Sequence, residues 1–297
     1  MKKLLGIFFF YIILAVLLLP LLVTLLCGGF GTELPQQAKG LYGVSDLIPL
    51  ESELEEYVAG VVAAEMPASF PEEALKAQAV AARTYQVRQM QEQGSDKVLY
   101  DVGQAYIDER EQAEKWGENT AFYQAKIRQA VRETAGEVMT YDGEPILAAF
   151  HAQSAGRTED AVQVWKEAVP YLKSVDSSLD RNAPEHETEV FFSAEEVEQK
   201  LGKGEVQVLS RTAAGYTEKV QVGEKVISGR KVREALGLRS SCFSMEKEGD
   251  GYLFTVLGYG HGVGMSQYGA AFLAEEGMTY RQILEHYYQG VSFEKVE

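Results

Sequence analysis

Residues 50–93 have the sequence LESELEEYVAGVVAAEMPASFPEEALKAQAVAARTYQVRQMQEQ, and this stretch decides the fold. Two helix-forming halves, separated by the proline-bearing segment MPASFP, predict two helices with a short break between them. Apolar side chains and one carboxylate share a face of the first helix, at Leu54, Val58, Val61 and Glu65. Pro67 ends this helix, so Glu65 is expected in its last turn.

Glu65 is the residue of this stretch best suited to acid–base chemistry. Apolar neighbours remove water from its carboxyl group, and the C-terminal end of a helix carries partial negative charge. Both effects disfavour the charged form and raise the pKa of Glu65, as a general acid working near neutral pH requires. The alternative interpretation is structural, a partly buried carboxylate paired with Arg83 or Lys76 of the second helix.

The second helix has clear signals at both ends. Pro71 suits the first helical position, and the acidic pair Glu72 and Glu73 suits the positive end of the helix. The alanine-rich residues 74–82 allow another backbone to approach closely, and Gly94 is the predicted stop.

The rest of the chain mixes predicted helices with β-hairpins. Residues 121–135 predict a helix, and AspGly at 142–143 predicts a hairpin whose second strand leads to His151. Residues 187–256 are expected to form a small inserted β-rich subdomain. Further elements are expected there and beyond it: strands at 205–209 and 219–222, a hairpin at 248–251, and helices at 228–237, 266–276 and 279–290. These features predict an α+β fold in which helical segments carrying Glu65 pack with β-hairpins.

Residues 258–270, GYGHGVGMSQYGA, form a glycine-rich motif directly before a predicted helix. Such glycine density indicates special backbone angles or close backbone approach. The motif lacks the Lys-Ser/Thr pair of a P-loop and fits the dinucleotide fingerprint poorly. We interpret it as the wall of a cleft opposite Glu65.

Residues 1–32 are expected to form a cytoplasmic start and a single membrane anchor. Lys2 and Lys3 precede an almost wholly apolar run, 7–26, which is long enough to span a bilayer and places the N-terminus in the cytoplasm. A cleaved signal peptide and a lipoprotein modified at Cys27 are the weaker alternatives. Residues 33–46 are then a linker, and residues 47–297 a catalytic domain outside the membrane.

Overall charge and cysteine content exclude several classes of protein. The net charge of −16 argues against nucleic-acid binding, because a phosphate backbone would be repelled. Two cysteines, Cys27 and Cys242, support neither a disulfide framework nor a multi-cysteine metal site.

Two long strings, VVAAEMPASFPEEALKAQAVAARTY and GYGHGVGMSQYGA, closely resemble the stage II sporulation protein D family. FHAQSAGRTE at 150–159 and VPYLKSVDS at 169–177 also resemble it, and the similarity extends over roughly residues 50–290. This family comprises membrane-anchored lytic transglycosylases that act on peptidoglycan during endospore engulfment.

The resemblance implies a mechanism with one carboxylate. Protonated Glu65 would donate to the glycosidic oxygen between N-acetylmuramic acid and N-acetylglucosamine. Ionised Glu65 would then take the proton of the C6 hydroxyl as this group attacks C1, leaving a 1,6-anhydro end. A hydrolytic glycosidase would need a second carboxylate.

The resemblance and the residue chemistry together give candidate substrate-binding residues: Arg83, Lys76, Ser154, Lys173, Asp180, His261, Gln267 and Tyr268. We expect Arg83 to face the substrate and not to touch Glu65, because an adjacent cation would lower the pKa of the acid.

No cofactor and no metal are expected. The resemblance raises the question of a zinc site with Cys and His ligands, but His151 has no cysteine nearby in sequence, and four scattered histidines are not a zinc signature.

The expected partners are peptidoglycan glycan strands, the membrane, and the wall amidase and membrane protein of the engulfment machinery, stage II sporulation proteins P and M. The expected location is the septal and engulfing membrane of the mother cell. The alternative from another class is a non-catalytic wall-binding module similar to amidase enhancers, in which Glu65 would be structural.

Overall fold

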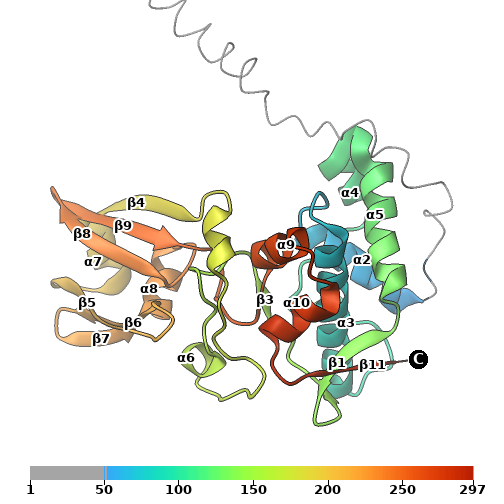
Figure 1. The fold of residues 1–297 in the computed structure, drawn as a ribbon. Helices are drawn as coiled ribbons and strands as arrows, with labels where there is room; N and C mark the ends of the chain where they lie inside the picture. The colour runs from blue at the N-terminus through green and yellow to red at the C-terminus, as the bar shows by residue number, and fades with distance from the viewer. Residues whose placement is uncertain (1–49, 51, 297) are drawn as a thin grey trace, which may run out of the picture. The chain divides into compact units, whose positions relative to one another are not determined.

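The structure is a computed structural model, and it describes residues 50 and 52–296 (Figure 1). Its first helix is α2, Glu53–Glu65, which begins after Ser52, whose side chain accepts a hydrogen bond from the Glu55 amide. Met66 is already extended, at φ −119° and ψ 143°, because an α-helical conformation is disfavoured directly before a proline. Glu65 is therefore the last residue of α2, as predicted.

The second helix, α3, spans Glu72–Gln93. Pro71 is its N-cap and not its first helical residue, and Gly94 ends it in the left-handed conformation at φ 61°. The alanines of α3 are buried, and the helix packs against α2, α5, α9, α10 and β1 (Figure 1). Small side chains let α3 form the centre of the helical layer.

The helices that surround α3 complete this layer. They are α4, Glu109–Trp116, followed by the 3₁₀ turn η3, Gly117–Asn119; α5, Thr120–Glu133; α9, Gln267–Glu275; and α10, Tyr280–Tyr287. α10 is shorter than predicted, because Tyr288 and not Gly290 caps it.

Two small sheets lie beside the helices. The strands β1, Glu137–Tyr141, β2, Glu144–Pro145, and β11, Ser292–Lys295, form an antiparallel sheet in the order β11-β1-β2. Asp142 and Gly143 both have positive φ, 53° and 82°, and make the predicted hairpin turn. A parallel pair, β3, Phe150–His151, and β10, Met265–Ser266, joins the two motifs that the sequence separates by more than a hundred positions.

The connection from β3 toward the β-rich part contains two short helices. These are α6, Ala161–Trp165, and the 3₁₀ helix η4, Ser178–Asn182.

Residues 187–257 contain two three-stranded antiparallel sheets. One has the order β4-β9-β8, from β4, Glu187–Ser193, β9, Gly251–Leu257, and β8, Phe243–Glu248. The other has the order β5-β6-β7, from β5, Val206–Arg211, β6, Thr217–Val222, and β7, Lys225–Ser228. Two helices accompany them, α7, Ala194–Leu201, and α8, Gly229–Leu236.

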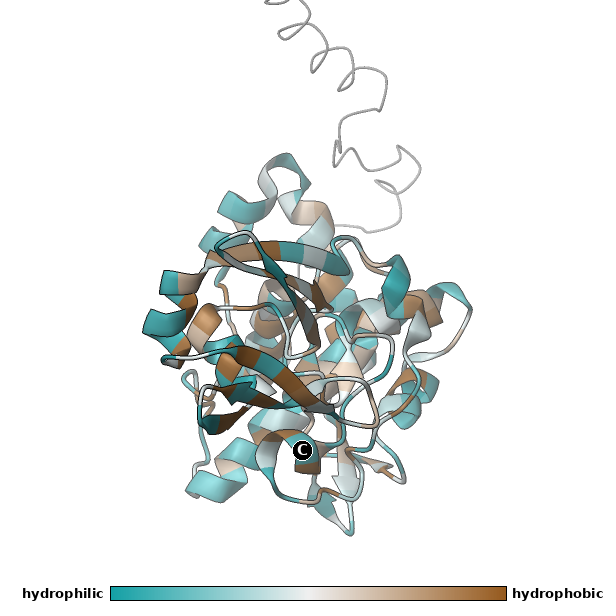
Figure 2. Ribbon diagram, turned by 90° about the vertical axis from the view of Figure 1, so that its left-hand side faces the viewer, coloured by the Kyte–Doolittle hydropathy of each residue, from teal (hydrophilic) through white to brown (hydrophobic). Residues whose placement is uncertain are grey.

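This β-rich part has a hydrophobic cluster drawn from its own residues. Buried members include Val197 of α7, Val220 of β6, Val232 of α8, and the ring pair Phe243 and Phe254. Apolar and polar residues alternate along the strands, as Figure 2 shows in brown and teal. In β5 and β6 the alternation turns Val206, Val208, Val220 and Val222 toward the hydrophobic cluster.

The mixture of helices with small antiparallel sheets confirms the α+β prediction. β4, α6, α7 and β11 were not predicted from the sequence. Within the described residues, no helix is both long and apolar enough to cross a membrane. The predicted anchor, 1–32, and the linker, 33–46, lie outside the described residues and remain predictions.

Candidate functional site

Glu65 lies at the C-terminal end of α2 and faces a cavity of about 570 Å³. The lining includes Tyr85 of α3, Trp165 of α6, and His261 of the glycine-rich motif. Residues 147–150, Gly103, Glu167 and Val169 complete it. The predicted opposition between Glu65 and the glycine-rich motif is therefore present in the geometry.

The Glu65 carboxyl group is half-buried and held by hydrogen bonds. The Ala105 amide donates to Oε1 over 2.8 Å, and the Gln267 side chain makes a second hydrogen bond to the same group. Gln267 is only 5% exposed and also donates to Gln78 Oε1 over 3.4 Å. These contacts fix the position of the carboxyl group with respect to the cleft.

Burial is the largest influence on the pKa of Glu65 and raises it. The Ala105 amide, Gln267 and the charge of Lys115 favour the ionised form, but the net direction remains upward. The sequence argument from burial thus agrees with the structure. A carboxyl group in this environment can hold a proton before reaction, and its hydrogen-bond partners can stabilise the carboxylate afterwards.

Lys115 of α4 is the cation near Glu65. The sequence did not predict this contact. The Lys115 ammonium group donates to the carbonyl oxygens of Ala63 and Ala64, at 2.8 and 3.5 Å. Those carbonyls belong to the last turn of α2, so Lys115 offsets the negative end of the helix. The predicted contribution of the helix end to the raised pKa is correspondingly weakened.

The glycine-rich motif needs its glycines. Gly262 and Gly264 have φ of 82° and 73°, which L-residues with side chains rarely adopt. A Cβ at Gly264 would lie 2.0 Å from the Ala149 carbonyl oxygen. These glycines let the segment run against β3 and bring His261 into the cleft.

Two histidine rings pack together behind the cleft. The ring centroids of His151 and His261 are 5.6 Å apart, and Trp165 lies 5.6 Å from His261. Burial lowers the pKa of His151 to about 3 and that of His261 to about 4, so both rings are neutral at pH 7. His261 Nδ1 accepts from the Val263 amide, over 3.1 Å.

The prediction that Arg83 faces the substrate is wrong. Arg83 is fully buried, and its guanidinium makes two hydrogen bonds to the Glu55 carboxylate, at 2.8 and 2.6 Å. It also donates to the Glu137 carbonyl oxygen over 3.0 Å. A side chain with these buried contacts cannot reach a ligand, so Arg83 joins α2, α3 and β1.

Lys76 does not line the Glu65 cleft either. Its ammonium group pairs with Glu73 at 2.7 Å and with Glu133 at 2.5 Å, and its side chain is only 12% exposed. The Glu133 contact holds α3 against α5, and the substrate-binding prediction for Lys76 is corrected accordingly.

Asp180 and Ser154 are also buried and structural. Asp180 Oδ2 accepts from the Ser154 amide and the Ser177 hydroxyl, and its Oδ1 accepts from the Ser266 hydroxyl. Both Asp180 and Ser154 are 0% exposed. Asp180 thus joins the 150–159 loop, η4 and the start of α9. Asp180 and Ser154 were predicted to bind substrate, but neither side chain is accessible to a glycan.

The remaining candidates occupy different places. Lys173 is half-buried and pairs with Asp160 at 3.4 Å, outside the lining of the Glu65 cavity. Tyr268 is half-buried, with its ring 5.0 Å from Phe70 and 6.4 Å from Phe272. Their predicted contacts with substrate remain predictions.

The sequence analysis missed Tyr85, Trp165 and Glu167 in the cleft. Tyr85 donates to the Val102 carbonyl oxygen over 2.8 Å, which presents its ring at the cavity wall. Glu167 is exposed and is a second carboxylate at the same cavity. Trp165 and Glu167 stand within VWKEAVPYL, where an aromatic beside a carboxylate was the available signal.

The residues present do not fit a zinc site. His151 Nε2 is buried without a hydrogen-bond partner, but no group of three His, Cys, Asp or Glu side chains converges among the described residues. Cys242 is buried in the β-rich part, where its thiol contacts the Gly215 carbonyl oxygen. That no metal binds remains a prediction.

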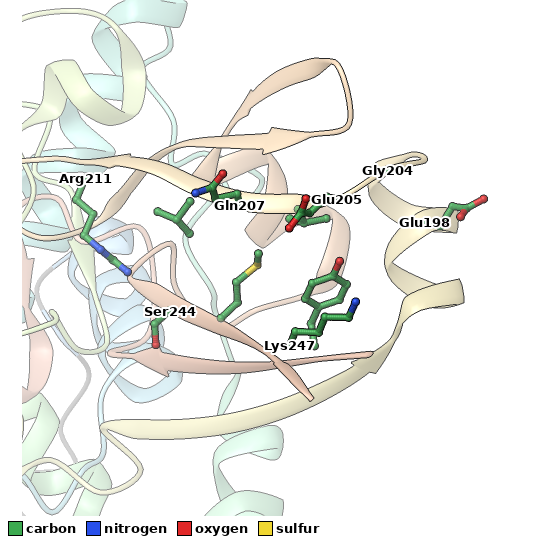
Figure 3. Close-up of a pocket in the computed structure, with 11 residues that line it drawn as sticks. Glu198, Gly204, Glu205, Gln207, Arg211, Ser244 and Lys247 are labelled. Atoms are coloured by element: carbon green, nitrogen blue, oxygen red, sulfur yellow. The ribbon is translucent and has the colours of Figure 1, made fainter. Parts of the chain in front are cut away.

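The cavity between β5 and β8 is larger, about 730 Å³, but lies away from Glu65. Figure 3 shows Arg211 toward one end of it and Glu198 toward the other. Arg211 closes its end by donating to the Phe243 carbonyl oxygen over 2.8 Å. With no buried acid and no histidine in its lining, this cavity is a weaker candidate for catalysis.

Comparison with known proteins places these features in a family. The family model described as stage II sporulation protein matches residues 49–141, which include α2 and α3. Stage II sporulation protein D of Bacillus subtilis is 41% identical over 257 residues, covering 82% of this chain and 75% of that protein. Stage II sporulation protein D of Bacillus amyloliquefaciens is 42% identical with the same coverage.

A more distant relative is named amidase enhancer. This Bacillus subtilis protein is 28% identical over 293 residues, which is 78% of this chain but 39% of the relative. The much closer agreement with the two sporulation proteins decides the assignment. The chain belongs to the stage II sporulation protein D family, a family of sporulation proteins.

Proposed function

We propose that this protein is a lytic transglycosylase that cleaves the bond between N-acetylmuramic acid and N-acetylglucosamine in glycan strands stripped of stem peptides. The observation that carries the proposal is Glu65, a half-buried carboxyl group with a raised pKa at the wall of a cleft. Such a group can hold a proton near neutral pH and deliver it to a glycosidic oxygen.

The surroundings of Glu65 support both halves of the reaction. Burial favours the protonated acid before the bond breaks. The Ala105 amide and Gln267 then stabilise the carboxylate that proton donation leaves behind. This carboxylate takes the proton of the C6 hydroxyl as that oxygen attacks C1, which closes the 1,6-anhydro ring and regenerates the acid without consuming water.

Hydrolysis is a second candidate because Glu167 lines the same cavity. A glycosidase uses two carboxylates, one of which activates water or attacks the sugar. Glu167 is exposed and lies beside the short helix α6, so its environment is that of an ordinary solvated carboxylate. This difference from Glu65 favours the single-acid mechanism.

A non-catalytic role is the alternative from another class. The relative named amidase enhancer covers most of this chain, and in this alternative Glu65 would serve only to hold residues 105 and 267 in place. The position of Glu65 at the wall of a cleft, together with its raised pKa, favours the enzyme.

The proposal extends to place and partners. The apolar run at 7–26 would anchor the protein in the septal and engulfing membrane, with residues 47–297 outside. A wall amidase would supply stripped strands, and stage II sporulation proteins P and M are the proposed partners.

The test is product analysis with the full-length protein in detergent. Wild type and Glu65→Gln are incubated with peptide-stripped strands and with intact peptidoglycan, and the fragments are weighed by mass spectrometry. Anhydro ends from wild type alone support the proposal. Reducing ends heavier by one water indicate hydrolysis, and stimulation of an added amidase without any cleavage indicates the enhancer role.

A further inference from the structure

A second cavity, of about 250 Å³, adjoins the Glu65 cleft. Trp165 and His261 line both cavities, so the two spaces share a wall. The opposite side of the second cavity comes from the β-rich part, with Thr212, Tyr216 and Arg233 among its lining residues. A ligand in the cleft therefore has a polar neighbouring space within reach of a side group.

Most charges around this second cavity are already neutralised. Arg230 pairs with Glu234 at 2.8 Å and donates to the Val164 carbonyl oxygen. Glu218 accepts from the Ser210 hydroxyl and lies 3.8 Å from the ammonium group of Lys219.

Glu159 is the third carboxylate at this cavity. It accepts from the Thr212 hydroxyl at 2.6 Å and from the Asp160 amide at 3.0 Å. Each of these three carboxylates is therefore already engaged by a hydrogen bond or an ion pair.

Arg233 is the exception. Its Nε donates to the Leu238 carbonyl oxygen over 3.3 Å, while its two terminal nitrogens make no hydrogen bond or ion pair with any described residue. The side chain is half-buried, and burial lowers its pKa. A guanidinium that is partly removed from water, and whose terminal nitrogens make no ion pair, is a site for an anion, above all for a planar carboxylate.

We propose that Arg233 and this cavity bind a carboxylate carried by the glycan, the free lactyl group of N-acetylmuramic acid, beside the sugar held at Glu65. The inference rests on the proposed function. A stem peptide converts the lactyl carboxylate into a neutral amide, which offers Arg233 no ion pair and needs more room. The cavity would thus give a physical basis for the preference for stripped strands that the proposed function already includes.

Binding can be measured without any cleavage. The full-length protein in detergent is titrated with N-acetylmuramic acid and with its methylamide, and dissociation constants are obtained by ligand-observed NMR. We expect wild type to bind the acid about tenfold more tightly, the effect of one charge-assisted hydrogen-bonded pair. Arg233→Gln should reduce this ratio to about one, and Arg233→Lys, which keeps the charge but loses the planar fork, should leave an intermediate ratio.

Lys231→Gln is the matched control, because it removes one positive charge from the same helix at an exposed position outside the cavity lining. It should keep the wild-type ratio. Equal binding of acid and amide by wild type would overturn the inference, and so would an unchanged ratio in a folded Arg233→Gln protein. Arg233→Lys tests the same point if Arg233→Gln does not fold.

The outcome is separable from that of the proposed function. A wild-type preference for the acid that Arg233→Gln abolishes supports the carboxylate site even where no anhydro product forms. Anhydro products without that preference support the transglycosylase and overturn the carboxylate site.

Discussion

Arg83 and Glu55 form a doubly hydrogen-bonded ion pair between α3 and α2, with Nε–Oε1 and Nη2–Oε2 distances of 2.8 and 2.6 Å. Glu55 is 4% exposed and Arg83 is 0% exposed, so the pair is screened from water. The same guanidinium also reaches the Glu137 carbonyl, where β1 begins. The helix that ends at Glu65 is therefore fixed from its other end.

Replacing Arg83 should destabilise the protein and leave glycan recognition unaffected in the folded fraction. Arg83→Ala leaves the Glu55 carboxylate buried and unpaired, which typically costs about 3–5 kcal/mol. Chemical unfolding measures the loss. Arg110→Ala removes an exposed pair with Glu114, 84% and 66% exposed, and should cost less than about 1 kcal/mol. A stable Arg83→Ala protein that fails to bind glycan would restore the substrate-binding role.

Lys115→Met should raise the pKa of Glu65 further. The charge of Lys115 favours the Glu65 carboxylate, so removing it favours the protonated acid. In a pH–rate profile the limb assigned to Glu65 should move to higher pH. Lys126→Met is the control: Lys126 also donates to carbonyl oxygens, of Ala68 and Phe70, but its charge does not act on Glu65. An unshifted limb in Lys115→Met would contradict this prediction.

Local signals in the sequence were enough to predict much of the fold. Pro67 and Gly94 end helices, and AspGly at 142–143 reverses the chain, through backbone geometry alone. Both helix ends and the turn are found where the sequence predicted them. The raised pKa of Glu65 followed from its apolar helical face. These features depend on neighbours within a few residues, which a sequence displays directly.

The contacts of charged side chains could not be predicted from neighbouring residues in the sequence. Arg83 was expected at the substrate because a cation beside Glu65 would lower the pKa of the acid, but Arg83 pairs with Glu55, nearly three helical turns before Glu65. Lys115 contacts the end of α2 from α4, a polar helix. The sequence of α4 has no apolar periodicity from which its packing could be predicted. Such pairings depend on how α2, α3 and α4 pack, and periodicity does not determine packing.

His151 should make the protein sensitive to acid. Its pKa is about 3 in the folded state and near 6.5 when unfolded, so the unfolded chain takes up a proton first as pH falls. The stability from the neutral ring is complete above about pH 6.5 and is lost progressively as pH drops toward the folded value. Between pH 7 and pH 5 this single group should remove about 2 kcal/mol.

Glu65→Gln and Glu167→Gln should separate the two carboxylates of the cleft. Loss of Glu65, the proposed general acid, should lower the rate of anhydro-product formation by about 10²–10⁴-fold, whereas loss of the exposed Glu167 should change it less than about threefold. Both variants keep the side-chain size, so unequal rates reflect chemistry and not cavity shape. Rates come from the mass-spectrometric assay on stripped strands, with thermal unfolding to show that both proteins fold. Equal losses would instead indicate that the two carboxylates cooperate in the reaction.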